Sequence, residues 1–135
     1  MARVVSVNHI AVAVDDLDKA LEFWRDKLGL VLDHIEEVPS QNAEVAFLPI
    51  GGSEIELVRP TSDDTGLAKF IKQRGMGLHH LCMQVDDIEE MLKKLESTGV
   101  RLINNEAVEL PGRKMAFIHP ASTNGVLVEL YELVK

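Results

Sequence analysis

The chain contains the same pattern twice, and each copy carries one histidine and one glutamate at equivalent points. The segment 8–17 reads Asn-His-Ile-Ala-Val-Ala-Val-Asp-Asp-Leu and is matched by 79–88, His-His-Leu-Cys-Met-Gln-Val-Asp-Asp-Ile, so that His80 follows His9 by 71 positions. Glu56, within Ile-Glu-Leu, is matched 73 positions later by Glu129, within Val-Glu-Leu. Two histidines and two glutamates related by a duplication could converge on one divalent metal near a pseudo-twofold axis.

The length of the repeat predicts two modules that share one domain, residues 1–135. A chain of 135 residues with 46% hydrophobic content can bury one core, whereas either half alone is short for independent folding. Solenoids use shorter periods and more copies. Module one is expected at about 1–75 and module two at about 76–135, joined at Gly75-Met76-Gly77.

Each copy begins with alternation typical of a strand and continues into helical spacing. Both histidines fall on the strand face opposite its most apolar residues, and the Asp-Asp step that follows is suited to cap a helix. We expect these helices over 17–28 and 88–95, ended by Gly29 and Gly99, and a further helix over 66–74. Strands are expected at 31–38, 44–48, 54–58, 101–103, 114–118 and 126–131. The order is βαβββ twice, which is an α+β fold.

Composition excludes several classes of function. A net charge of −8 argues against nucleic-acid binding, which needs clustered Lys and Arg. No stretch approaches the roughly 20 apolar residues of a membrane span, and the first residues lack the pattern of a signal peptide. The one cysteine, Cys82, is compatible with a reducing compartment. We therefore expect a cytoplasmic protein that binds neither nucleic acid nor membrane.

The four paired side chains indicate a catalytic metal site. Histidine is a poor core residue for a strand, and the duplication sets His9 and His80 apart from the other histidines. Glu56 and Glu129 interrupt apolar strands, although Glu54 lies on the same strand face as Glu56 and is its rival if the register differs. Two imidazoles and two carboxylates suit Co, Ni, Mn, Fe or Zn and leave positions open for substrate, whereas structural zinc sites are richer in cysteine.

These motifs resemble the vicinal oxygen chelate superfamily over essentially the whole chain. Within it, the second half is similar to the methylmalonyl-CoA epimerase family, on the motifs Gly-Leu-His-His (77–80), Val-Asp-Asp-Ile (85–88), Phe-Ile-His-Pro (117–120) and Gly-Val-Leu-Val-Glu-Leu (125–130). The resemblance implies two tandem βαβββ modules that form a curved mixed sheet around a metal site. It also implies epimerisation of (2R)- and (2S)-methylmalonyl-CoA, an acyl-CoA substrate, by removal and return of the C2 proton through a metal-stabilised enolate.

The resemblance also assigns roles to residues of this chain. It implies one divalent metal, Co2+ first and Mn2+, Ni2+ or Zn2+ as alternatives, and a catalytic base at Glu44, just before an apolar run. The second proton-transfer group could be Glu129, acting from the metal shell, or a residue that the sequence does not identify. Some members of the family carry glutamine in place of Glu56. The implied metal ligands are His9, Glu56, His80 and Glu129.

The sequence leaves the roles of several other polar residues open. Arg113 and Lys114 are candidates for binding the CoA phosphates or the substrate carboxylate, and a solvated turn explains them equally well. Cys82 is expected to face the same way as His80 and to fill space. His34 is expected to be exposed, and His79 and His119 have no assigned chemistry.

Three other functions share parts of this pattern. A glyoxalase I, or lactoylglutathione lyase, uses the same ligand set. An extradiol dioxygenase needs only two histidines and one carboxylate and is usually longer. A metal-free binding module on the same fold needs no ligands at all. Exposed strand edges also predict a homodimer.

Overall fold

The computed structural model describes residues 1–134 and divides the chain into two compact units. Unit 1 joins the two ends of the chain, Met1–His9 and His80–Lys135, and unit 2 is the intervening segment Ile10–His79. The first strand, β1 (Val4–Ala13), contributes to both units, because the division falls between His9 and Ile10.

Unit 2 is built on four strands with helices on both sides of the β3–β4 hairpin. Its strands lie in the order β2–β3–β4–β1, and β3 pairs antiparallel with both β2 and β4. After β1 its elements are α1 (Leu17–Leu21), the π-helix η1 (Glu22–Lys27), β2 (His34–Val38), the 3-10 turn η2 (Pro39–Gln41), β3 (Ala43–Ile50), β4 (Ser53–Pro60) and α2 (Gly66–Arg74).

Strand alternation divides the hairpin of unit 2 into two faces. One face, here called the α1 face, packs Ala46, Leu48 and Leu57 against Leu17 and Leu21 of α1. The other, the α2 face, packs a cluster that includes partly buried side chains of α2. The buried members of that cluster are Ala11, Ala13, Ala43, Val45 and Val58.

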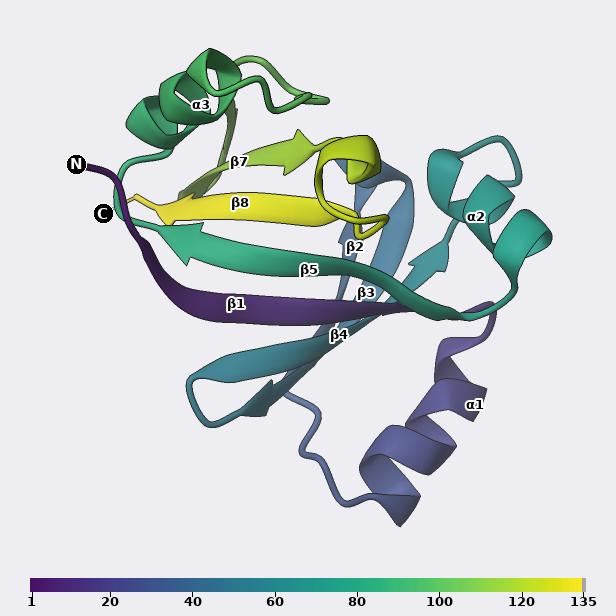
Figure 1. Cartoon of the computed structure of the whole chain (residues 1–135). Helices are drawn as coiled ribbons and strands as arrows, with labels where there is room; N and C mark the ends of the chain where they lie inside the picture. The colour runs from purple at the N-terminus through teal and green to yellow at the C-terminus, as the bar shows by residue number, and fades with distance from the viewer. Residues whose placement is uncertain (135) are drawn as a thin grey trace. The chain divides into compact units, whose positions relative to one another are not determined.

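Unit 1 has five strands in the order β1–β5–β8–β7–β6. Figure 1 shows β1 and β5 running side by side in opposite directions, as neighbours in the sheet. β5 pairs parallel with β8, and β7 pairs antiparallel with β8 and β6. After β1 its elements are β5 (Gly77–Val85, in this unit from His80), α3 (Ile88–Ser97), β6 (Val108–Leu110), β7 (Arg113–Ile118), the 3-10 turn η3 (Pro120–Ser122) and β8 (Val128–Leu133).

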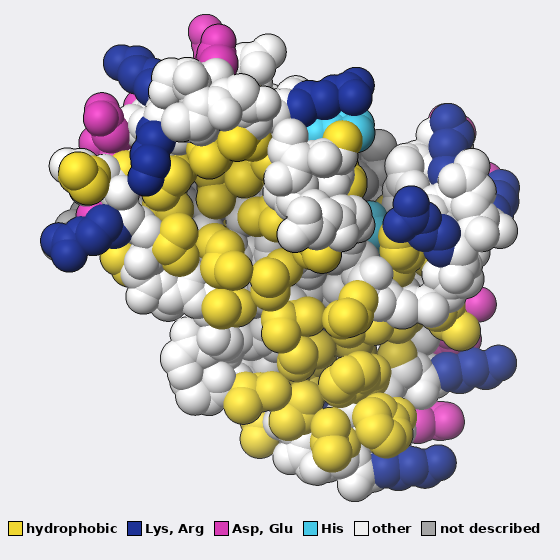
Figure 2. Space-filling model, in the orientation of Figure 1, with side chains coloured by type: hydrophobic (Ala, Val, Ile, Leu, Met, Phe, Trp, Pro, Cys, Tyr) yellow, Lys and Arg dark blue, Asp and Glu magenta, His cyan; other side chains and the backbone are white. Residues whose placement is uncertain are grey.

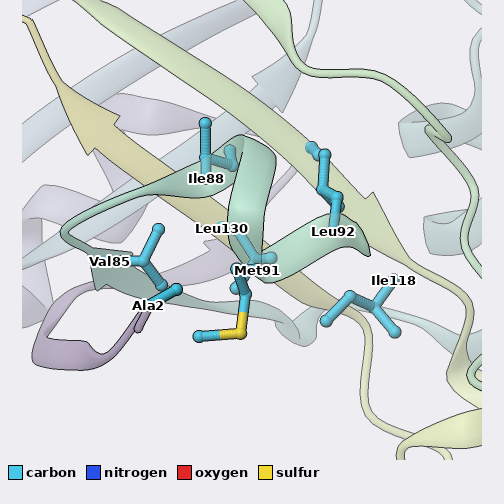
Figure 3. Packing of buried hydrophobic residues seen from close by; sticks show 8 residues of the cluster. Ala2, Val85, Ile88, Met91, Leu92, Ile118 and Leu130 are labelled. Atoms are coloured by element: carbon cyan, nitrogen blue, oxygen red, sulfur yellow. The ribbon is translucent and has the colours of Figure 1, made fainter. Parts of the chain in front are cut away.

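The core of unit 1 lies between α3 and one face of its strands, here called the α3 face. Figure 3 shows Ile88, Met91 and Leu92 of α3 beside Leu130 of β8 and Ile118 of β7. Because side chains alternate along a strand, the residues between these point to the opposite face, here called the site face.

The helix starts and ends follow the sequence expectations. Asp16 accepts a hydrogen bond from Lys19 N and Asp87 accepts one from Glu90 N, so each Asp-Asp step caps its helix. Gly29 and Gly99, which end the two helical segments, have φ of 92° and 86°, a backbone conformation that favours glycine. Together with the strand order, these features confirm the α+β fold of two βαβββ modules.

Three local expectations were wrong. Residues 101–103 form no strand, only a single bridge from Leu102 to Ile118, and the strand after α3 is β6, whose short alternation carried no strong signal. The helix over 17–28 changes after Leu21 into a π-helix, with Leu28 N bonded to Phe23 O at 2.7 Å. The strand expected from Val31 begins only at His34.

The two faces of β1 are buried to different extents. The face of His9, Ala11 and Ala13 is the more deeply buried, at 1%, 0% and 0% exposed. Small side chains allow close packing on that face, and this close packing cannot be predicted from side-chain hydrophobicity alone.

Within the described residues 1–134, the helices are all too short or too polar to span a membrane.

The core of unit 1 generates a stability prediction. Leu92→Ala removes a side chain that is 3% exposed and should lower the free energy of unfolding by about 2–5 kcal/mol through the cavity it leaves. Leu133→Ala, at a position that is 54% exposed, should change it by less than about 0.5 kcal/mol. Urea unfolding of both variants measures the difference, and equal losses would contradict the assignment of this core.

Candidate metal centre

Three of the predicted ligands meet on the site face of unit 1. His9 Nε2 lies 3.2 Å from His80 Nε2 and 3.2 Å from Glu129 Oε1, and His80 Nε2 lies 3.0 Å from the same Oε1. Their side chains are 1%, 10% and 2% exposed. Two imidazole nitrogens and one carboxylate oxygen therefore form a compact triangle with little access to water.

The register of three neighbouring strands explains this convergence. Since β1 and β5 are adjacent strands from equivalent points of the duplication, their histidines lie side by side. In the parallel β5–β8 ladder Cys82 is paired with Glu129, which sets the carboxylate on the same face as Cys82 and His80. The α3 face of the same strands carries the apolar core. The strands of unit 1 thus have an apolar α3 face and a polar site face.

Aromatic side chains pack against the two imidazoles. The ring of Tyr131 lies edge-on to His9 at 5.2 Å between centroids, and that of Phe117 edge-on to His80 at 5.6 Å. Phe117 is paired with Glu129 in the β7–β8 ladder, so it belongs to the site face as well. These contacts restrict the rotation of both imidazoles and hold their nitrogens toward Glu129.

The buried carboxylate is kept in its charged form by its neighbours. Burial alone would raise the pKa of Glu129, but hydrogen bonds from His80 and then His9, with the charges of both rings, hold that pKa below its ordinary value. Glu129 is therefore ionised at neutral pH. It offers an anionic oxygen of the kind that a divalent cation requires.

The distances within this triad fit a divalent metal ion. Two ligands at right angles on an ion with bonds of about 2.1 Å lie about 3.0 Å apart, whereas a tetrahedral angle places them about 3.4 Å apart. The observed separations run from 3.0 Å, the first value, to 3.2 Å, midway between the two values, so they suit a divalent ion of either geometry. Three donors leave at least one further coordination position for a fourth side chain, water or substrate.

Cys82 lies close to this triad. Its side chain is fully buried, and its sulfur is within 4.8 Å of ligand atoms of both His9 and Glu129. The expectation that Cys82 faces the same way as His80 is confirmed. Its sulfur fills the space beside the ligand atoms.

Glu56 is a buried carboxylate of unit 2. It is 7% exposed and lies on β4 opposite Phe47, on the α2 face. Glu54, its rival on the same face, is only partly buried and pairs with Pro49 near the hairpin turn. On burial, Glu56 is the stronger candidate of the two for a ligand.

Glu44 points to the other face of the same hairpin. It is paired with Arg59 across the β3–β4 ladder, and its Oε1 accepts hydrogen bonds from Arg59 Nη2 at 3.0 Å and Nε at 3.1 Å. By alternation both residues belong to the α1 face with Ala46 and Leu57. The structure therefore does not bring Glu44 and Glu56 to one face of the sheet.

Lys114 and Arg113, the two candidates for binding an anion, lie on opposite faces of β7. Lys114 Nζ donates to Glu89 of α3 at 2.6 Å, and this contact raises the pKa of Lys114 through the hydrogen bond and the nearby negative charge. Arg113 lies on the site face, where its guanidinium stacks on Tyr131 at 5.4 Å. Its Nε is buried and has no hydrogen-bond partner among the described residues. Arg113 is thus the better placed of the two to meet an anion.

The remaining histidines have structural surroundings. His34 is half exposed, as expected, and bonds to Asp33. His79 packs edge-on against Phe70. His119 caps η3 by accepting a hydrogen bond from Ala121 N at 3.0 Å, which explains the histidine of the Phe-Ile-His-Pro motif as a turn-forming residue.

Two polar residues beside the triad were not found from the sequence. Asn8 contacts His9 at 2.7 Å, and Gln84 contacts Asn8 at 3.2 Å. Asn8 directly precedes the first histidine of the repeat, and that position was the available signal. For Gln84 the sequence carries no signal beyond its place on the same strand face as His80 and Cys82.

Comparisons with known proteins show which family the chain belongs to. Residues 8–117 match the Glyoxalase/Bleomycin resistance protein/Dioxygenase superfamily. The mitochondrial methylmalonyl-CoA epimerase of Mus musculus is 36% identical over 126 residues, which cover 92% of this chain and 71% of that protein.

Solved structures extend the similarity to the whole fold. The methylmalonyl-CoA epimerase of Mycobacterium tuberculosis is 36% identical with a TM-score of 0.89, covering 98% of this chain and 90% of that one. A variant of the Streptomyces coelicolor methylmalonyl-CoA epimerase in complex with 2-nitronate-propionyl-CoA is 29% identical with a TM-score of 0.90, covering 98% and 96%. The chain belongs to the Glyoxalase/Bleomycin resistance protein/Dioxygenase superfamily and is a relative of its methylmalonyl-CoA epimerases.

Proposed function

We propose that the protein is a metal-dependent epimerase that interconverts (2R)- and (2S)-methylmalonyl-CoA. The observation that carries this proposal is the buried triangle of His9, His80 and Glu129. The similarity to methylmalonyl-CoA epimerases, one of them solved with an acyl-CoA ligand, supports the choice of substrate.

The proposed metal ligands are the triad and, as the fourth, Glu56. The duplication and the burial of Glu56 within its own unit support its inclusion. A divalent ion held there supplies a Lewis acid for the negative charge that develops on the thioester oxygen when the C2 proton leaves. We place Co2+ first, as the resemblance implies, with Mn2+, Ni2+ or Zn2+ as alternatives.

Inversion at C2 requires one group to remove a proton and another to return it on the opposite side. The resemblance assigns the first step to Glu44, and the second group is Glu129, acting from the metal shell, or a residue that the sequence does not identify. Arg59 holds Glu44 through Oε1 alone, and among the described residues no hydrogen bond engages its Oε2, which is the atom that would take the proton. A base within hydrogen-bond reach of the proton typically contributes about 10²–10⁴-fold to the rate.

The division of the hairpin into two faces suggests a competing base. Glu36 on β2 pairs with Val45 of the α2 face, whereas Glu37 pairs with Glu44 on the α1 face. Glu36 therefore points to the same side of the sheet as Glu56. If the base lies on the face of Glu56, Glu36 is the carboxylate of β2 and β3 that occupies it.

The metal site is tested by elemental analysis. Purified protein should contain close to one divalent metal ion per chain, and His80→Ala should retain only a small fraction of it, because one corner of the triad is gone. His34→Ala, which removes a half-exposed histidine of unit 2, is the matched control and should keep its metal. A His80→Ala variant with full metal content would remove His80 from the ligand set.

The base is tested by proton exchange. Metal-loaded enzyme in deuterated water should incorporate deuterium at C2 while it interconverts the epimers. Glu44→Gln keeps the shape of the side chain but accepts no proton, so it should keep its metal and lose about 10²–10⁴-fold in turnover.

Two outcomes of this experiment redirect the assignment. A deficit below about tenfold in Glu44→Gln, together with a large deficit in the matched Glu36→Gln, would move the base to the α2 face. Absence of exchange by the metal-loaded wild type would contradict the epimerase itself. Turnover of a glutathione hemithioacetal would then identify a glyoxalase I.

We also propose that the protein forms a homodimer. Figure 2 shows hydrophobic side chains gathered over the region where Figure 1 draws α1 and β4, and in unit 2 Phe23, Leu28 and Ile50 are 50%, 54% and 46% exposed. Exposed apolar patches of this kind mark interaction surfaces.

Sedimentation tests the dimer. The wild type should sediment at about twice the 15.0 kDa of the chain. Leu28→Glu should shift it toward the monomer because a charge would be buried, while Leu133→Glu, equally exposed on unit 1, should not. A mass near 15.0 kDa over a wide concentration range would refute the dimer.

A further inference from the structure

His9 is linked to two polar side chains that are not themselves candidate ligands. Its Nδ1 lies 2.7 Å from Asn8 Oδ1, and Asn8 Nδ2 donates a hydrogen bond to Gln84 Oε1 at 3.2 Å. All three residues belong to unit 1. The chain of contacts runs from Gln84 through Asn8 to the ring nitrogen that faces away from the triad.

The chemistry of these groups fixes the position of a proton. The amide of Asn8 directs its N–H to Gln84, which leaves its carbonyl oxygen toward His9. A carbonyl oxygen only accepts, so Nδ1 of His9 must donate and must carry the proton. In the metal-free protein the ring can carry a second proton at Nε2, the atom 3.2 Å from both His80 Nε2 and Glu129 Oε1, and donate it to Glu129. A divalent metal would replace that second proton, and with the first proton held at Nδ1 the lone pair of Nε2 would face the ion.

We propose that Asn8 and Gln84 are positioning residues that hold His9 in the Nδ1-protonated tautomer, so that Nε2 is ready to bind a divalent metal. Gln84 acts through Asn8: without it the Asn8 amide can flip and offer its NH2 group to Nδ1. This inference rests on the proposed metal site and adds two residues to it that touch neither metal nor substrate.

The two residues that make this arrangement are not repeated in the other copy of the duplication. The residue that precedes His80 is His79, which packs against Phe70 instead, and the position equivalent to Gln84 in the first copy is Ala13. The duplication therefore accounts for both histidines but not for the Asn8–Gln84 pair. Outer partners of metal-binding histidines commonly contribute about 10- to 100-fold to metal affinity.

The first test reads the tautomer in metal-free protein by 15N NMR of the histidine side chains. His9 is assigned by the signal that His9→Gln lacks, and the tautomer is read from the spectrum of its neutral ring. The wild type should carry the proton at Nδ1, and Asn8→Leu should shift it toward Nε2. A wild-type His9 protonated at Nε2 would overturn the proposal, whatever the variants do.

The second test measures metal affinity by competition with a chelator, using Co2+. Asn8→Leu should bind about 10- to 100-fold more weakly, and Gln84→Met should fall between it and the wild type. Asn8→Asp keeps an acceptor for Nδ1 and should restore binding. Asn105→Leu, at an exposed position in the same unit, is the matched control and should bind as the wild type does.

These readouts separate the inference from the proposed function. Wild-type affinity in Asn8→Leu, or failure of Asn8→Asp to restore it, would overturn the positioning role. Because neither measurement uses turnover, an inactive enzyme with the expected tautomer and affinities would refute the epimerase and leave the role of Asn8 and Gln84 standing.

Discussion

The structure depends on a buried carboxylate with two imidazoles around it. Glu129 is 2% exposed in the middle of β8, where an unpaired charge would destabilise the fold by several kcal/mol. His9 and His80 remove that penalty by bonding to the same oxygen, and they do so only if β1, β5 and β8 are neighbours in the observed register. The requirement to pair this one charge therefore constrains the strand order of unit 1.

Most of the fold could be predicted from the duplication and from the residues that cap the helices. Asp16, Asp87, Gly29 and Gly99 set the helix boundaries through local chemistry that a sequence reports directly. The strand β6 was missed because three residues with weak alternation give no periodic signal, and their pairing with β7 is decided by tertiary contacts. The change from α-helix to π-helix after Leu21 was missed for a related reason: helical spacing of Leu17, Leu21 and Trp24 fits either form over so short a run.

The residues of the candidate site also differ in whether the sequence alone could predict their positions. The convergence of His9, His80 and Glu129 follows from equivalent positions in a repeat, so the sequence was sufficient to anticipate it. The opposite orientations of Glu44 and Glu56 depend on the length of the turn between β3 and β4, because one residue more or less inverts every side chain of a strand. Asn8 and Gln84 are 76 positions apart, and no periodicity relates them.

The division of β1 between the two units has a consequence for how the protein could be cut or rearranged. Its first residues complete unit 1, although they are separated from the rest of that unit by the whole of Ile10–His79. A chain cleaved at Met76 would leave His9 on one fragment and both His80 and Glu129 on the other. Neither fragment would hold the triad, and the second would lack β1, which unit 1 requires. Recovery of metal binding on mixing would thus report reassociation of the fragments. A circular permutant that begins at residue 77 would test whether the order of the two modules along the chain matters at all.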